Sequence, residues 1–137
     1  MSKAIRKTSC SVVEQTEASV EFQRDVAERL IKYGRMVVAR GYIHNSLGNI
    51  AIRVRHPAFP HGVAYAKHAG VSLEEMELEH VVITDIPTGQ LLHGSVPTSV
   101  GHKLSREILR LRPDINAVIH VHHDETIAHF AAGQIGT

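Results

Sequence analysis

The sequence predicts one α/β domain in which helices cover a sheet. Segments with helical spacing of apolar residues alternate along the chain with segments that have the pattern of strands. The 137 residues are enough for a single hydrophobic core, and the apolar fraction of 43% is that of a folded globular protein. We expect a domain over residues 17–137, preceded by a flexible tail over residues 1–16.

Amphipathic segments predict the helices. The apolar residues of the first segment recur at helical spacing, and those of the second lie on one face before Pro113 ends the helix. A short helix is expected to start at Ser72, because Ser72-Leu73-Glu74-Glu75 matches a capping box. The three longer helices are expected over residues 17–40, 100–111 and 126–132.

Alternation and β-branched runs predict the strands. Residues 50–55 alternate strictly, which indicates a half-buried strand that Pro57 and Pro60 end. Residues 81–84 are apolar and β-branched, and Pro87-Thr88-Gly89 turns the chain back into residues 90–92 as a hairpin. Further strands are expected at 63–66, as a short return strand, and at 117–121, as a buried strand.

Composition narrows the class of protein. The formal net charge is +1 and no basic run occurs, which argues against nucleic-acid binding. No apolar run has the length of a membrane span, and the N-terminus lacks the apolar core of a secretory signal. The single cysteine, Cys10, fits a reducing compartment, so we expect a cytoplasmic protein. The 11 histidines are numerous, and histidine is the commonest metal ligand.

His120 and His122 are the strongest candidate metal ligands. Side chains two residues apart project from the same face of a strand, so both imidazoles could reach one ion. The spacing alone also fits one core histidine and one solvated histidine. A zinc site normally has at least three protein ligands. The third could be His102, His129 or His44, or a residue outside this sequence.

Two loops could bind an anion. In Ser46-Leu47-Gly48-Asn49, small and amide residues allow the backbone to approach a ligand closely. Thr98 and Ser99 precede a predicted helix, whose N-terminus favours a phosphate or carboxylate. An ordinary turn and an ordinary helix cap explain the same residues equally well.

Taken together, these segments resemble the class II aldolase/adducin family. They occur in the family's order and with about its spacing, over roughly residues 22–132. The matching pieces are Ser46 to Ile50, Gly70 to Met76, Val82 to Asp85 followed by Gly89, Pro97 to Ser99, and Arg112 to Asp114 running into Asn116 to His122.

The resemblance implies a three-layer α/β/α domain with a single central sheet, in a homo-oligomer that is usually a tetramer. It implies a divalent ion, zinc in the first place with manganese or cobalt as alternatives, on His120, His122 and a later third ligand. It also implies a small anionic substrate such as a sugar phosphate, bound at Ser46, Gly48, Asn49, Gly70, Thr98 and Ser99. Family chemistry passes through an enediolate that the metal stabilises: aldol cleavage, epimerisation or decarboxylation.

The sequence departs from the family pattern in four places. The usual catalytic acid falls on Val100 or Gly101, and the histidine four residues later falls on Leu104 or Ser105. His102 is nearby and is the candidate catalytic residue. Lys67-His68 replaces a Thr-Pro pair, and the lysine could bind an anion. Family members are longer, and this sequence ends before the expected third ligand.

These departures favour a decarboxylase over an aldolase, because loss of carbon dioxide generates the carbanion without a base. The sequence therefore predicts a metal-dependent lyase or epimerase. The alternatives are a non-catalytic adducin-like module for assembly or protein binding, and a truncated, inactive homologue.

Overall fold

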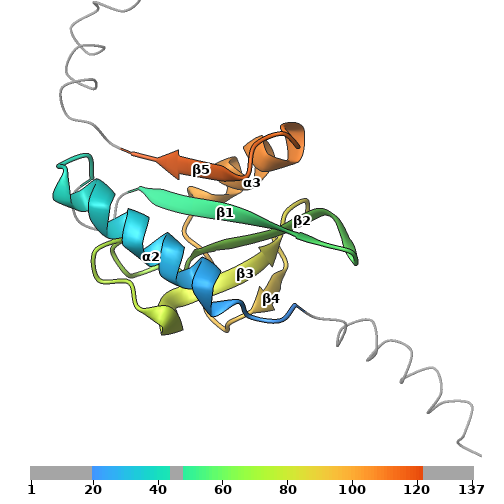
Figure 1. Cartoon of the computed structure of the whole chain (residues 1–137), viewed down its shortest axis with the longest axis horizontal. Helices are drawn as coiled ribbons and strands as arrows, with labels where there is room; N and C mark the ends of the chain where they lie inside the picture. The colour runs from blue at the N-terminus through green and yellow to red at the C-terminus, as the bar shows by residue number, and fades with distance from the viewer. Residues whose placement is uncertain (1–19, 44–47, 122–137) are drawn as a thin grey trace, which may run out of the picture.

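The computed structural model describes residues 20–43 and 48–121. These residues form helices packed on a single sheet, which confirms the predicted α/β class (Figure 1). In chain order the elements are α2 (Arg24–Ala39), β1 (Asn49–His56), β2 (Phe59–Lys67), the 3-10 helix η1 (Leu78–His80), β3 (Val81–Asp85), β4 (Leu91–His93), α3 (His102–Leu111) and β5 (Ala117–His120). The expected tail over residues 1–16 and helix over 126–132 lie outside the described residues, and the domain limits stay predictions.

The sheet is antiparallel throughout the described residues. Its strand order is β4-β3-β2-β1-β5, so β1 lies between β2 and β5. Ala51 of β1 pairs with Ala66 on one side and with Val118 on the other. The predicted hairpin over residues 81–92 is confirmed as the β3–β4 pair, in which Thr84 pairs with Leu91. This topology brings the C-terminal strand β5 beside the N-terminal strand β1.

The two α-helices contact opposite faces of the sheet (Figure 1). On the α2 face, Leu30 and Ile31 pack with Val63, Tyr65 and other large side chains of the strands. The α3 face has a smaller core of Ala51, Ala64, Ile86 and Leu109. Because alanines line this face of β1 and β2, the α3 backbone can lie close to the sheet, and polar residues of α3 can reach strand residues.

The N-terminus of α2 differs from the prediction. The helix begins at Arg24, and Val20 to Gln23 are not helical. The backbone N–H of Gln23 donates to the phenol oxygen of Tyr65 at 2.8 Å, which holds Gln23 in an extended conformation. This tertiary contact, which local periodicity does not encode, sets the start of the helix.

Two local predictions in the middle of the chain are wrong. Ser72 begins a turn, because the hydroxyl of Ser72 accepts from the Glu75 backbone N–H and donates to the Glu75 carboxylate without a helix following. Pro60 does not precede the return strand but lies inside β2, which starts at Phe59. It is exposed beside the hairpin tip, where the β1–β2 register is irregular and proline is tolerated.

The burial predicted for two strands is also wrong. β1 was expected to be half-buried, yet both of its faces are covered along its first half, and Arg53 is only 5% exposed. β5 was expected to be buried, yet it forms an edge of the described sheet, and Ile119 is 48% exposed. Alternation in sequence reports side-chain polarity and not whether a second layer covers the polar face.

Candidate functional site

His120 is placed at the end of β5, directly opposite Asn49 of β1. Side chains of residues paired in this way lie on the same face of a sheet. Asn49 contacts α3, so both side chains lie on the α3 face. The structure therefore brings together two predicted site residues that are far apart in the sequence.

The N-terminal end of α3 packs against this pair. The Ser105 hydroxyl donates to Oδ1 of Asn49 at 2.9 Å, and both residues are buried. A Cβ added to Gly101 would lie 2.4 Å from Nδ2 of Asn49 and 3.7 Å from Nδ1 of His120. Only a glycine at 101 leaves room for the Asn49 amide in this position.

Gly48 supports the same site from the backbone. Its φ of +80° is strained for any residue with a side chain, and a Cβ there would lie 2.7 Å from the carbonyl oxygen of His120. A side chain at position 48 would therefore push β5, and His120 with it, away from β1. The predicted position Ser46 lies outside the described residues.

Gly70, Thr98 and Ser99 lie on the loops around the N-terminus of α3. Thr98 forms an isolated β-bridge with His68, and the Ala69 backbone N–H donates to the Pro97 carbonyl at 2.8 Å. These contacts hold the Gly70 loop beside the segment that leads into α3. The Ser99 hydroxyl is buried and has no hydrogen-bond partner among the described residues. Buried hydroxyls normally have a hydrogen-bond partner, so this one can bond to a ligand.

His102 is the first residue of α3, is buried in the core and is only 1% exposed. Its Nε2 is 2.9 Å from Oγ1 of Thr84 in β3, whereas Nδ1 has no partner among the described residues. Burial, with a smaller contribution from Arg106, lowers the pKa of His102 to about 4. This histidine is neutral at neutral pH and bonded to the sheet, so its geometry gives no support to the catalytic role, which stays a prediction.

Lys67 does not face the site. It pairs with Val81 and follows Tyr65 by two residues in β2, which places its side chain on the α2 face. Burial lowers the pKa of this lysine. The anion-binding role considered for Lys67 therefore lacks support from its position on the face opposite His120.

A pocket of about 330 Å³ opens between α3 and β5. Ser105 and His120 are the polar residues that line this pocket, and the other lining residues are apolar. The remaining lining residues are Leu104, Ile108, Val118, Ile119 and Val121. A volume of this order accommodates a small molecule.

The described residues do not complete a metal site. Within residues 20–43 and 48–121 no three His, Cys, Asp or Glu side chains are grouped as metal ligands. Of the predicted ligands, His120 and His102 lie in this part of the chain, and His102 is bonded to Thr84 in the core. His122, His44 and His129 lie outside it. One imidazole is fewer than the three protein ligands a zinc site normally needs, so we derive no reaction step through a metal.

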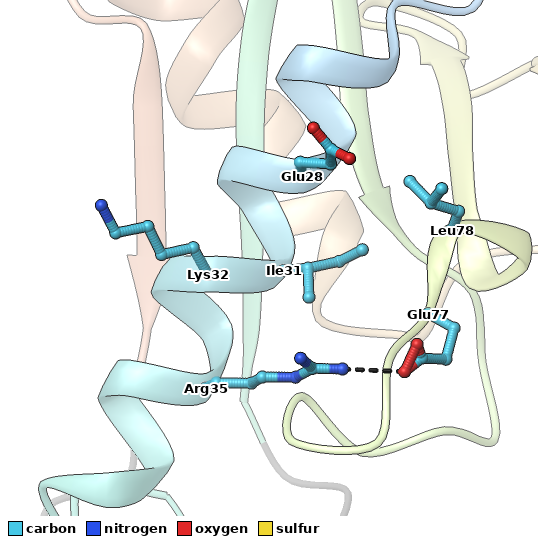
Figure 2. Close-up of a pocket in the computed structure, with 6 residues that line it drawn as sticks. All are labelled: Glu28, Ile31, Lys32, Arg35, Glu77 and Leu78. Carbon is cyan, nitrogen blue, oxygen red and sulfur yellow. Dashed lines mark hydrogen bonds and ion pairs between the residues drawn. The ribbon is translucent and has the colours of Figure 1, made fainter.

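A second depression lies on the opposite side of the molecule. Figure 2 shows the ion pair that crosses it, in which Arg35 Nη2 of α2 is 2.8 Å from the Glu77 carboxylate before η1. Both partners are exposed, so the pair adds little stability. This depression is not lined by His120.

The sequence did not identify two residues that contact the candidate site. Ser105 and Gly101 were noted only as positions where the family acid and histidine are absent. The structure places Gly101 against Asn49 and His120, whereas Val100 is 94% exposed. This settles which of the two residues faces the site.

The family description "Class II Aldolase and Adducin N-terminal domain" matches residues 28–135. The chain belongs to this family. The match confirms the resemblance drawn from the sequence segments, and it covers the loops and strands that form the candidate site.

Solved structures of family members share the fold. An L-fuculose 1-phosphate aldolase is 24% identical with a TM-score of 0.69, over 79% of this chain and 49% of that one. YgbL from Klebsiella pneumoniae, a candidate aldolase/epimerase/decarboxylase, is 21% identical with a TM-score of 0.64, over 77% and 47%. An aldolase II superfamily protein from Pseudomonas syringae is 20% identical with a TM-score of 0.67, over 76% and 41%.

These likenesses establish the fold and not the reaction, because the identities are low. The chain spans less than half the length of each of these proteins. A comparison with curated protein sequences gave no match. None of the helices among the described residues is long and apolar enough to cross a membrane.

Proposed function

We propose that this chain forms part of a metal-dependent lyase or epimerase that acts on a small anionic, oxygenated substrate such as a sugar phosphate. The observation that carries the proposal is the pairing of His120 with Asn49 at the N-terminal end of α3. It brings a candidate metal ligand, an amide and the positive end of a helix together beside a pocket that Ser105 and His120 line. Family membership supports the same reaction class.

His120 and His122 would hold the divalent ion, with zinc proposed first and manganese or cobalt as alternatives. When bound, such an ion stabilises negative charge that develops on a substrate oxygen. An anionic group of the substrate would bind near His120, at Gly48 and Asn49. Thr98 and Ser99, which lead into α3, would bind the same group. Ser46 and Gly70 complete the proposed substrate-binding set.

We prefer a decarboxylase within this class. The position that faces the site is a glycine, and neither Gly101 nor Ser105 has a side chain that can act as a general acid or base at neutral pH. Decarboxylation needs no base to generate its carbanion, because the departing carbon dioxide leaves the electron pair on the substrate. A proton must still be delivered afterwards, and His102 stays the predicted donor.

The proposal extends to the assembly. The family resemblance supports a three-layer α/β/α arrangement, a homotetramer and a cytoplasmic location. Contacts of α2 and α3 with opposite faces of the sheet are compatible with the three layers.

Metal content tests this proposal directly. Protein purified without chelator is expected to contain about one zinc, manganese or cobalt ion per chain, and His120→Ala or His122→Ala is expected to weaken metal binding at least ~100-fold. His61→Ala, on the β1–β2 hairpin, is the matched control and should retain the ion. Release of carbon dioxide from a panel of phosphorylated and unphosphorylated sugar acids, with aldol cleavage of sugar phosphates measured in parallel, assigns the reaction.

Protein without metal, whose properties do not change on substitution of His120 and His122, would contradict the enzyme proposal. It would favour the adducin-like assembly module or an inactive homologue. Aldol cleavage without decarboxylation would contradict the preferred reaction and retain the class.

A further inference from the structure

We infer that Ser105 and Gly101 are positioning residues that fix the Asn49 amide so that its N–H groups, and not its oxygen, lie against Gly101 on the side of His120. There they donate to an anionic oxygen of the substrate. The inference rests on the proposed function for the identity of the ligand, but the orientation of Asn49 stands on contacts within the chain.

The first contact fixes one end of the amide. Ser105 lies on the first turns of α3 and is 1% exposed, and Asn49 at the start of β1 is 4% exposed. The Ser105 hydroxyl donates to Oδ1 of Asn49 at 2.9 Å, so the amide oxygen is bonded to the helix. Because both groups are buried, rotating the amide would leave polar atoms without partners, which is costly.

The second contact fixes where the other end points. Nδ2 of Asn49 lies against the bare Cα of Gly101, at a place where a Cβ would approach to 2.4 Å. The same Cβ position is 3.7 Å from Nδ1 of His120. The amide nitrogen and the imidazole therefore both lie beside position 101, and a side chain there would collide with the amide.

The chemistry of the amide nitrogen selects the ligand class. An amide nitrogen carries two N–H donors and no lone pair for a cation, so Asn49 in this orientation suits an oxyanion rather than the metal ion. The start of α3 adds the positive end of a helix dipole, and the Ser99 hydroxyl lies on the segment leading into it without a partner among the described residues. A carboxylate or a phosphate fits these donors.

The glycine at position 101 and the serine at position 105 thus have a structural consequence. In place of proton-transfer groups, positions 101 and 105 supply space and one hydrogen bond, and both act on Asn49.

The test uses the side-chain amide resonances of Asn49 in the complete ¹⁵N-labelled chain, with inorganic phosphate and acetate as separate probes. In the wild type, the Asn49 amide resonances are expected to shift on titration with at least one of these anions. Ser105→Ala and Gly101→Ala are each expected to move these resonances before any anion is added. Both should weaken anion binding by about tenfold, the loss expected for one hydrogen bond to a charged group.

Two variants separate positioning from stability. Position 101 has a right-handed helical backbone that alanine adopts without strain, so a lower melting temperature in Gly101→Ala would report displacement of the Asn49 amide. Ser105→Thr keeps the hydroxyl and should bind the anion within about twofold of wild type, if its oxygen restores the bond to Asn49. Ser95→Ala, at an exposed serine before α3, is the matched control and should change neither measurement.

Unchanged Asn49 resonances in Ser105→Ala would overturn the positioning role. Wild-type protein whose Asn49 amide responds to neither phosphate nor acetate would overturn the anion-binding role. Neither measurement requires a metal or a turnover assay, so failure of the proposed lyase function is distinguishable from failure of this inference. Response to phosphate alone, or to acetate alone, identifies which oxyanion the site prefers.

Discussion

The two ends of α3 pack on the same face of the sheet but differ in the hydrogen bonding of their buried polar atoms. At the C-terminal end, the buried Arg53 guanidinium donates to the carbonyls of Leu109, Arg112 and Ile115 at 2.6–2.9 Å. It also donates to the His61 carbonyl at 2.8 Å. A cation bonded to the last carbonyls of a helix also complements the negative end of the helix dipole.

At the N-terminal end, polar atoms are buried without being fully bonded. The Ser99 hydroxyl and Nδ1 of His102 have no hydrogen-bond partner among the described residues. The polar atoms at the C-terminal end are thus bonded within the fold, whereas the Ser99 hydroxyl at the N-terminal end can bond to a ligand. Incomplete hydrogen bonding of polar groups therefore distinguishes the candidate site from the C-terminal end of α3, whereas burial of polar groups does not.

The largest expected effect tests the C-terminal end. Arg53→Met should lower the free energy of unfolding by about 3 kcal/mol or more, because several buried carbonyls lose their donors at once. Urea unfolding measures this loss. Arg55→Met on the same strand is the control: Arg55 is exposed and donates to the Pro113 carbonyl, so about 1 kcal/mol or less is expected. Equal losses in the two variants would contradict the role assigned to Arg53.

The next effect tests the N-terminal end through its pH dependence. Burial lowers the pKa of His102 to about 4 in the folded chain, whereas an unperturbed histidine has 6.5. As the pH falls from 6.5 to 4, the unfolded chain binds a proton that the folded chain does not. The folded state therefore loses stability across this window, by about 3 kcal/mol in total, and the loss levels off below pH 4.

His102→Gln should remove this part of the pH dependence, because glutamine does not titrate. Urea unfolding of both proteins at pH 7, 5.5 and 4 gives the comparison. The difference in stability between wild type and variant should shrink or reverse in favour of the variant as the pH falls. A difference that is constant over this range would show that His102 is protonated equally in both states.

The smallest effect tests which residue at the start of α3 faces the site. Val100 is 94% exposed, so Val100→Glu should change the free energy of unfolding by no more than about 0.5 kcal/mol. It should also leave the Asn49 amide resonances in place, in contrast to Gly101→Ala. Movement of those resonances in Val100→Glu would mean that the acid position of the family maps to Val100.

The sequence was sufficient for the class of fold and for most strands. Strand pairs such as β3–β4 follow from a local turn, and α3 follows from its apolar stripe and from Pro113. The start of α2 could not be predicted, since it depends on the hydroxyl of Tyr65, which is remote in sequence. The burial of Arg53 could not be predicted from the sequence either, because its hydrogen-bond acceptors are backbone carbonyls, which every residue has.

The sequence predicted which residues belong to the candidate site better than it predicted how they are arranged. Gly48, Asn49 and His120 were identified from loop chemistry and family resemblance, and the structure brings them together. His102 was chosen because imidazoles transfer protons, but periodicity could not reveal that it points to Thr84 in the core. Ser105 was identified only as one of two positions where the family histidine falls, and its bond to Asn49 could not be predicted, since a serine within a helix is ordinary.

The pairing of β1 with β5 has a consequence for how the chain folds. β1 and β2 are joined by a tight turn, and β3 and β4 by another, so these pairs close short loops. Asn49 and His120 meet only after the whole intervening polypeptide has been arranged, and closing a long loop costs more entropy. We therefore expect the pocket beside His120 to form among the last events of folding. During synthesis on the ribosome, the sheet can begin to assemble well before the residues of the site meet.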